Sequence, residues 1–270
     1  MIGILAAREN SLYYFTKVAV FCREKAVLFA MQYFATLPAS VSYITVNTAK
    51  KGYSKEKKWR MLMTDRQAKL PLTPRLSAGL LTPVMLRKLA AIAEKYEGII
   101  KIAGNSIVIL GLRPEHRAQA LGELGFDTQS LAGKTVRSTA VCAGQPHCPR
   151  ALQDSTRLGL DLDTRFYGTE LPGKLRMGVS GCPNGCSEIF VKDIGLYGTA
   201  GGYTIIAGGN SGRKAQAGRV VAEKVPPAEV VPSIEKIIAY YQTYGQPGER
   251  LGQTIDRLGF EDFVACIGIN

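Results

Sequence analysis

Two pairs of cysteines, Cys142-x5-Cys148 and Cys182-x3-Cys186, restrict this chain more than any other feature of its sequence. Each pair lies in a short stretch that also carries the Gly and Pro residues needed for tight ligand turns. Two-residue gaps on both sides are typical of zinc ribbons, whereas gaps of five and three suit a bulkier centre. Thiolate ligation of an iron–sulfur cluster is the usual example of such a centre. The spacing therefore predicts a four-thiolate metal site, with a cluster favoured and a structural zinc ion as an alternative.

The long fixed string Gly181-Cys-Pro-Asn-Gly-Cys-Ser187, preceded by Cys-x5-Cys, resembles the signature of the sulfite and nitrite reductases that hold sirohaem against a 4Fe-4S cluster. The resemblance implies four cluster ligands, Cys142, Cys148, Cys182 and Cys186, with Cys186 also bridging to the sirohaem iron. It further implies an oxidoreductase that reduces sulfite to sulfide or nitrite to ammonia. The alternative is a non-catalytic electron-transfer or tetrapyrrole-handling iron–sulfur protein.

The charge balance of the chain favours anionic partners. Its 34 basic and 22 acidic residues give a net charge of +12. A small oxyanion substrate, a tetrapyrrole with eight carboxylates and an acidic electron donor, such as a ferredoxin or a reductase subunit, would each be attracted by this excess. Nucleic acid is not expected, because no basic helix or aromatic-interleaved basic patch follows residue 60. Six cysteines, four of them in ligand spacing, do not form a disulfide framework, so we expect a reducing, cytoplasmic location.

Composition divides the chain into three parts. Residues 1–62 are aromatic-rich and end in a run of lysines, and we interpret them as an N-terminal extension, disordered or absent from the mature protein. Residues 63–132 and 133–270 are expected to form two α+β domains. The apolar run Ala26–Ala35 is too short to cross a bilayer, which needs about 20 residues, so no membrane span is expected.

Residues 63–132 show the pattern of a ferredoxin-like half-domain, which begins with an expected strand or extended segment at Thr73–Leu81. Thr82 and Pro83 are residues that start helices, and apolar residues then recur at helical spacing. Ile99–Ala103 and Ser106–Leu110 are β-type runs joined by Gly-Asn, which predicts a hairpin. A second helix is expected from Pro114 to Glu123. A similar half-domain precedes the cluster domain of sirohaem reductases.

The second part is predicted to be an α+β sirohaem/4Fe-4S-binding domain. We expect strands that lead into the two cysteine pairs at Lys134–Cys142 and Lys174–Val179, with a helix over Pro149–Gly159 between them. Further strands are predicted at Ile194–Tyr197 and Tyr203–Ala207, among glycines that let backbone approach a flat ligand. Two helical patterns, Pro232–Tyr244 and Gly248–Gly259, complete the scaffold.

The resemblance also implies basic residues around the substrate and the tetrapyrrole. The candidates for catalysis are Arg75 and Lys101, and those for sirohaem binding are Arg137, Arg176, Arg213 and Asn184. The hairpin turn Ala103-Gly-Asn-Ser106 lacks the basic residue usual in the family, which leaves sulfite or nitrite open as the substrate. Large relatives contain two copies of this unit and the chain has one, so a homodimer is one expected assembly.

Overall fold

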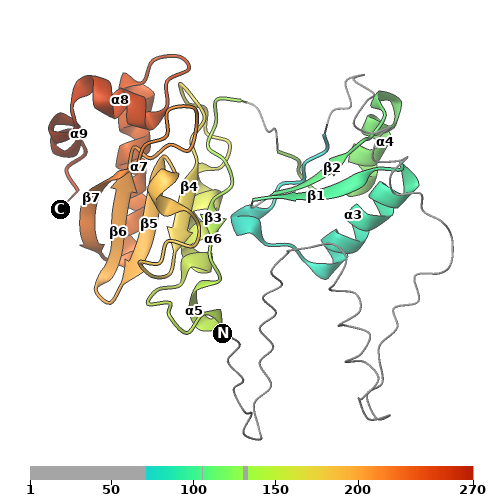
Figure 1. The fold of residues 1–270 in the computed structure, drawn as a ribbon, viewed down its shortest axis with the longest axis horizontal. Helices are drawn as coiled ribbons and strands as arrows, with labels where there is room; N and C mark the ends of the chain where they lie inside the picture. The colour runs from blue at the N-terminus through green and yellow to red at the C-terminus, as the bar shows by residue number, and fades with distance from the viewer. Residues whose placement is uncertain (1–70, 105, 130–132, 270) are drawn as a thin grey trace, which may run out of the picture. The chain divides into compact units, whose positions relative to one another are not determined.

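The computed structural model describes residues 71–104, 106–129 and 133–269. The predictions made for residues 1–62 lie outside these ranges. None of the helices that can be described is both long and apolar enough to cross a bilayer. Helices and strands are mixed throughout the described chain, and the predicted α+β class is confirmed (Figure 1).

The first helix, the hairpin and the second helix of the half-domain follow in the expected order, whereas residues 73–81, predicted to be a strand or extended segment, contain a 3-10 turn. Helix α3 (Pro83–Lys95) precedes the antiparallel strands β1 (Ile99–Ala103) and β2 (Ser106–Leu110), and α4 (Pro114–Leu124) follows. The Thr82 hydroxyl accepts a hydrogen bond from the Met85 amide at 3.2 Å, so it caps α3 as predicted. The predicted hairpin is confirmed. A short 3-10 turn, η2 (Ser77–Gly79), comes before α3.

A five-stranded sheet forms the centre of the second domain. Its order follows the chain: β3 (Ala140–Val141), β4 (Met177–Ser180), β5 (Ile194–Thr199), β6 (Gly202–Ala207) and β7 (Arg219–Val225). The first three strands are parallel and the last two are antiparallel to their neighbours. Parallel neighbours need a crossover, which α5 (Gly144–His147) and α6 (Ser155–Phe166) provide between β3 and β4. The carboxyl ends of β3 and β4 therefore meet at one edge of the sheet.

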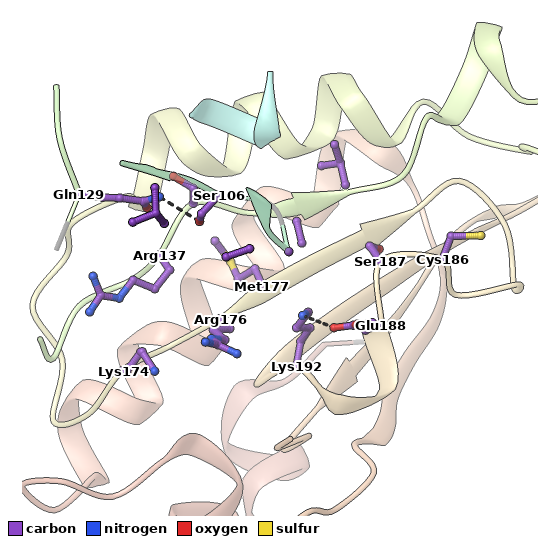
Figure 2. Close-up of a pocket in the computed structure, with 16 residues that line it drawn as sticks. Ser106, Gln129, Arg137, Lys174, Arg176, Met177, Cys186, Ser187, Glu188 and Lys192 are labelled. Carbon is purple, nitrogen blue, oxygen red and sulfur yellow. Dashed lines mark hydrogen bonds and ion pairs between the residues drawn. The ribbon is translucent and has the colours of Figure 1, made fainter. Parts of the chain in front are cut away.

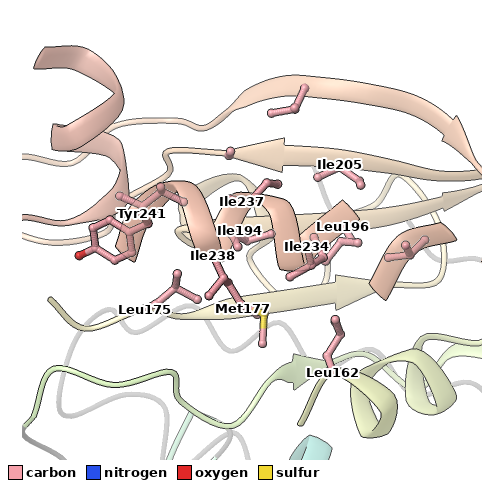
Figure 3. Packing of buried hydrophobic residues seen from close by; sticks show 14 of the residues in the cluster. Leu162, Leu175, Met177, Ile194, Leu196, Ile205, Ile234, Ile237, Ile238 and Tyr241 are labelled. Carbon is pink, nitrogen blue, oxygen red and sulfur yellow. The ribbon is translucent and has the colours of Figure 1, made fainter. Parts of the chain in front are cut away.

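The core of this domain lies between the sheet and two of its helices. Apolar residues of α6 and α7 (Pro227–Tyr244) recur at helical spacing and pack on strand residues, as Figure 3 shows for Leu162, Ile234 and Leu196. Helices α8 (Leu251–Leu258) and α9 (Phe260–Ile267) add further apolar residues, including the fully buried Phe263. This rigid layer supports the strands that lead to the cysteine pairs.

The predicted helix over Pro149–Gly159 is wrong in its position. Residues 149–154 form an irregular loop whose amides at Leu152 and Gln153 donate to the Gly181 carbonyl, at 2.7 and 3.1 Å. The helix begins only at Ser155, because the Asp154 carboxylate caps it by accepting from the Arg157 amide at 3.0 Å. Strand β7 and helix α9 are further elements that the sequence patterns did not predict.

Candidate active site

The two cysteine pairs lie side by side because the strands before them are parallel neighbours. Val141 pairs with Val179, and the Cys142 amide extends the ladder by donating to the Val179 carbonyl at 3.1 Å. Cys142 comes directly after β3, and Gly181 and Cys182 come directly after β4. The sheet register therefore brings the two ligand loops together.

Gly181 joins the two loops closely. Its amide donates to the Cys142 sulfur at 3.1 Å, and its carbonyl accepts from both Leu152 and Gln153. A Cβ at this position would lie 2.8 Å from the Gln153 carbonyl oxygen and 2.9 Å from the Ala151 Cβ. Only glycine allows this approach.

The four candidate thiolates differ in burial. Cys142 and Cys148 are partly buried, Cys182 is buried and Cys186 is exposed, and no described cysteine is in a disulfide. Within the described ranges, no three Cys, His, Asp or Glu side chains are grouped so that they could hold a metal ion. A 4Fe-4S cluster presents four irons, each of which takes one thiolate, so its ligands need not converge on one ion. The thiolate donors on two facing loops suit that chemistry.

A cavity of about 570 Å³ borders Cys186 and is rich in cations. Figure 2 shows Arg137, Lys174, Arg176 and Lys192 along it. Burial lowers the pKa of Lys174, and the nearby positive charges of Arg176, Arg250 and Arg137 lower it further. Burial likewise lowers the pKa of Arg137. Positive charges that lie close together repel one another, and a bound anion would reduce this repulsion.

The cavity also contains an ion pair near the second cysteine loop. A Glu188 carboxylate oxygen lies 2.9 Å from the Lys192 ammonium nitrogen (Figure 2). This hydrogen bond is the main cause that lowers the pKa of Glu188. Ser106 and Gln129, which are hydrogen-bonded to each other at 3.2 Å, line another part of the cavity.

A buried carboxylate fixes the strand that carries the cavity's cations. Asp193 is fully buried and accepts from the Arg176 amide at 2.7 Å. It also accepts two hydrogen bonds from the Arg250 guanidinium, at 2.9 and 2.5 Å. Arg250 is the residue that caps α8, so the position of Arg176 is tied to the start of that helix.

The structure places the predicted basic residues in different environments. Arg137 and Arg176, predicted to bind sirohaem, line the cavity, whereas Arg213 is exposed in the turn between β6 and β7. Arg75 lies 3.8 Å above the Tyr167 ring, outside the residues that line the cavity, and its predicted catalytic role stays a prediction.

The remaining predicted residues are exposed, and one cavity cation was overlooked. Lys101 is exposed on β1, and Asn184 is exposed between the last two cysteines. Their predicted roles are untested. Lys174 was missed, although its alternation with Arg176 before β4 could have indicated two side chains on one face.

The fold and site together define an α+β protein in which two cysteine loops meet at neighbouring strand ends, beside a cavity rich in cations. The chain belongs to the nitrite and sulfite reductase family. Residues 132–270 match the nitrite and sulphite reductase 4Fe-4S domain, and residues 64–126 match the ferredoxin-like half domain of the same enzymes. This membership confirms the predicted cofactors, a 4Fe-4S cluster and sirohaem.

Relatives of different lengths align with this chain. An assimilatory-type sulfite reductase from Nitratidesulfovibrio vulgaris is 33% identical over 210 residues, which are 77% of this chain and 96% of the relative. A nitrite reductase (NAD(P)H) from Bacillus subtilis is 32% identical over 190 residues, 70% of this chain but 24% of that protein. The chain therefore spans nearly all of the first relative and about a quarter of the second.

Two solved structures share the fold. Dissimilatory sulfite reductase I (DsrI) has a TM-score of 0.65 and 18% identity, over 74% of this chain and 68% of that one. The Mycobacterium tuberculosis NirA protein also has a TM-score of 0.65 and 18% identity, over 73% of this chain and 39% of that one. At this identity the two structures bear on the fold alone.

Proposed function

We propose that this chain is a small single-unit reductase that converts sulfite to sulfide, with nitrite, reduced to ammonia, as a second substrate. The observation that carries this proposal is the cationic cavity bordered by Cys186. The relative that this chain covers almost completely is named a sulfite reductase, which favours sulfite as the main substrate. Both reactions consume six electrons and form water from the substrate oxygens.

In this proposal Cys142, Cys148, Cys182 and Cys186 hold the 4Fe-4S cluster, and Cys186 also faces the tetrapyrrole. When bound, the two cofactors supply electrons and an open iron position for the substrate. Cys186 suits this boundary, because it is exposed and lines the cavity, whereas Cys182 is buried.

The cations of the cavity bind the anionic groups. Arg137, Lys174 and Arg176 would hold tetrapyrrole carboxylates and the substrate oxygens, and their positive field would stabilise negative charge that develops as oxygen leaves. Their amino and guanidinium groups also carry the hydrogen-bond donors that an oxyanion needs. The Asp193–Arg250 pair keeps the Arg176 backbone in place for this role.

An acidic redox protein as electron donor, a homodimer and a cytoplasmic location remain predictions. The positive charge of the chain supports an acidic donor, because opposite charges accelerate association.

The experiment is to purify the holoprotein anaerobically, supply reduced viologen, and measure sulfide from sulfite and ammonium from nitrite. Arg176→Met is compared with Arg87→Met, which removes the same charge from an exposed position on α3. We expect kcat/KM to fall about 100-fold in Arg176→Met, the scale for loss of one charge-stabilising donor, and to stay near wild type in Arg87→Met.

A holoprotein that shows the spectra of both cofactors but forms neither product would contradict the proposal. It would leave the alternative of a non-catalytic electron-transfer protein, which the absence of a basic residue from the turn Ala103-Gly-Asn-Ser106 favours.

A further inference from the structure

Glu188 is unusual among the residues of the cationic cavity. In the described part of the chain, it is the one acidic side chain lining a cavity that also contains Arg137, Lys174, Arg176 and Lys192. A cavity that only had to attract anions would gain nothing from a carboxylate, because a like charge repels the ligand. The position of this carboxylate therefore calls for a physical explanation.

The backbone and the strand below hold Glu188 and Lys192 in place. Glu188 has φ of 58°, a left-handed conformation that is uncommon for a residue with a side chain. Lys192 runs across Gly178 of β4, where an added Cβ would lie 3.0 Å from the Lys192 Cγ. The lysine side chain is 11% exposed and that of Glu188 is 72% exposed. The carboxylate thus lies where the cavity meets solvent, and its partner lies inside the wall.

This geometry differs from that of an ordinary surface ion pair. Exposed pairs contribute little because water screens both charges. Here the cation is largely withdrawn from water, and Arg176 is close enough for its charge to act on Glu188. An anion in the cavity would lie near both the Glu188 carboxylate and the Lys192 ammonium group with which that carboxylate is paired.

We propose that Glu188 selects singly charged over doubly charged oxyanions at the mouth of this cavity. The proposal deepens the proposed function, on which it rests. The carboxylate lowers the positive electrostatic potential inside the cavity. Because the binding energy of an ion changes in proportion to its charge, a dianion loses twice as much electrostatic binding energy as a monoanion. Selection by charge follows without any contact that distinguishes the shapes of the ligands.

The favoured ligands would be nitrite and hydrogen sulfite, the singly protonated form of sulfite. Reduction releases each substrate oxygen as water and so consumes protons. A pocket that admits hydrogen sulfite in preference to the sulfite dianion admits a substrate that already carries one of those protons.

The test measures the binding of sulfate, a dianion, and nitrate, a monoanion, to the anaerobically purified holoprotein by titration calorimetry at constant ionic strength. Glu188→Gln is compared with wild type and with Glu223→Gln. Glu223 is exposed on β7, at the opposite sheet edge from β3 and three strands from β4, so this control removes the same charge far from the cavity.

For Glu188→Gln we expect nitrate to bind about threefold more tightly and sulfate about tenfold, since the factor for the dianion is the square of that for the monoanion. Lys192→Met should weaken both ligands, with the same squared relation. Glu223→Gln should leave both affinities near wild type. The ratio of kcat/KM for sulfite to that for nitrite should rise in Glu188→Gln.

If Glu188→Gln folds and melts like wild type, equal changes in the affinities for sulfate and nitrate, or no change in either, would overturn the proposal. A lower sirohaem content in Glu188→Gln with an unchanged ratio of the two anions would also overturn it, because the carboxylate would then act on the cofactor. A wild-type protein that binds the anions but forms neither sulfide nor ammonia would instead contradict the proposed function, since the binding comparison does not need turnover.

Discussion

The two cysteine loops follow neighbouring strands and each lines a cavity, but among the described residues only the second loop contributes a cysteine to the cationic cavity. In the first loop, the Cys142 sulfur accepts from the Gly181 amide at 3.1 Å and lies 3.3 Å from the Ser155 hydroxyl oxygen. In the second loop, Cys182 is buried but Cys186 is exposed and lines the cationic cavity. The same chemical group is therefore held in two environments within one site.

This difference indicates a division of roles. A thiolate that accepts hydrogen bonds inside the protein has a fixed position and a tuned electronic character. A thiol that is exposed and lines a cavity, as Cys186 does, is accessible to a second centre. The comparison can be tested at single residues.

The largest difference is expected between Cys182→Ser and Cys186→Ser. Both should lose activity, but Cys182→Ser should also lose the cluster, because a hydroxyl replaces a buried thiolate whose binding stabilises the fold. Cys186→Ser should retain part of its iron and show sirohaem spectra uncoupled from the cluster. Iron content, visible absorption and EPR measure these outcomes. A Cys186→Ser protein with wild-type spectra and activity would contradict the bridging role.

A smaller effect is expected where the two loops touch. Gly181→Ala would press a Cβ against Gln153 and Ala151, and we expect a loss of about 1–3 kcal/mol in the free energy of unfolding. Gly122→Ala is the matched control, since no atom of another described segment lies within 4 Å of a Cβ added at this position of α4. It should stabilise the protein by about 0.5–1 kcal/mol. Urea unfolding of the two variants measures these changes. A wild-type free energy of unfolding in Gly181→Ala would show that the two loops do not pack closely.

The smallest effect concerns acid and lies outside both loops. Hydrogen bonds from Arg257, at 2.8 and 2.9 Å, are the main cause that lowers the pKa of Glu249 from 4.5 to about 2. The stability that this ionised group contributes is fully present above pH 4.5 and is lost as the pH falls towards 2.

The melting temperature of the cluster-free chain, followed from neutral pH to about pH 2, measures this contribution. Glu249→Gln should lower the melting temperature at neutral pH. Below pH 4.5, the melting temperature of this variant should fall less steeply than that of wild type. An equally steep decline in the variant would place the acid-sensitive group elsewhere, with the cysteine loops as the next candidates.

Local rules made the half-domain predictable. The Thr82 cap and the turn between β1 and β2 depend on residues close in sequence, so the first helix and the hairpin were predicted at their observed positions. The helix after the first cysteine pair was misplaced because distant contacts decide it. Gly181 draws residues 149–154 into a loop, which no periodicity records.

The cavity was harder to predict than the cysteines. A fixed spacing is enough to predict thiolate ligands, whereas a cationic cavity depends on which strand faces which loop. The place of Lys174 in the cavity became clear only from the fold, which puts this lysine near Arg137 and Arg176. Arg213, equally basic and also next to glycines in the sequence, proved to be exposed.

The link from Arg176 through Asp193 to Arg250 joins segments that lie far apart in the sequence. Asp193 and Arg250 are 57 positions apart, and α8 begins directly after Arg250. The backbone at Arg176 is therefore held by a contact that forms only when the start of α8 has reached Asp193. One wall of the cavity and the start of α8 should accordingly become ordered as one cooperative unit during folding.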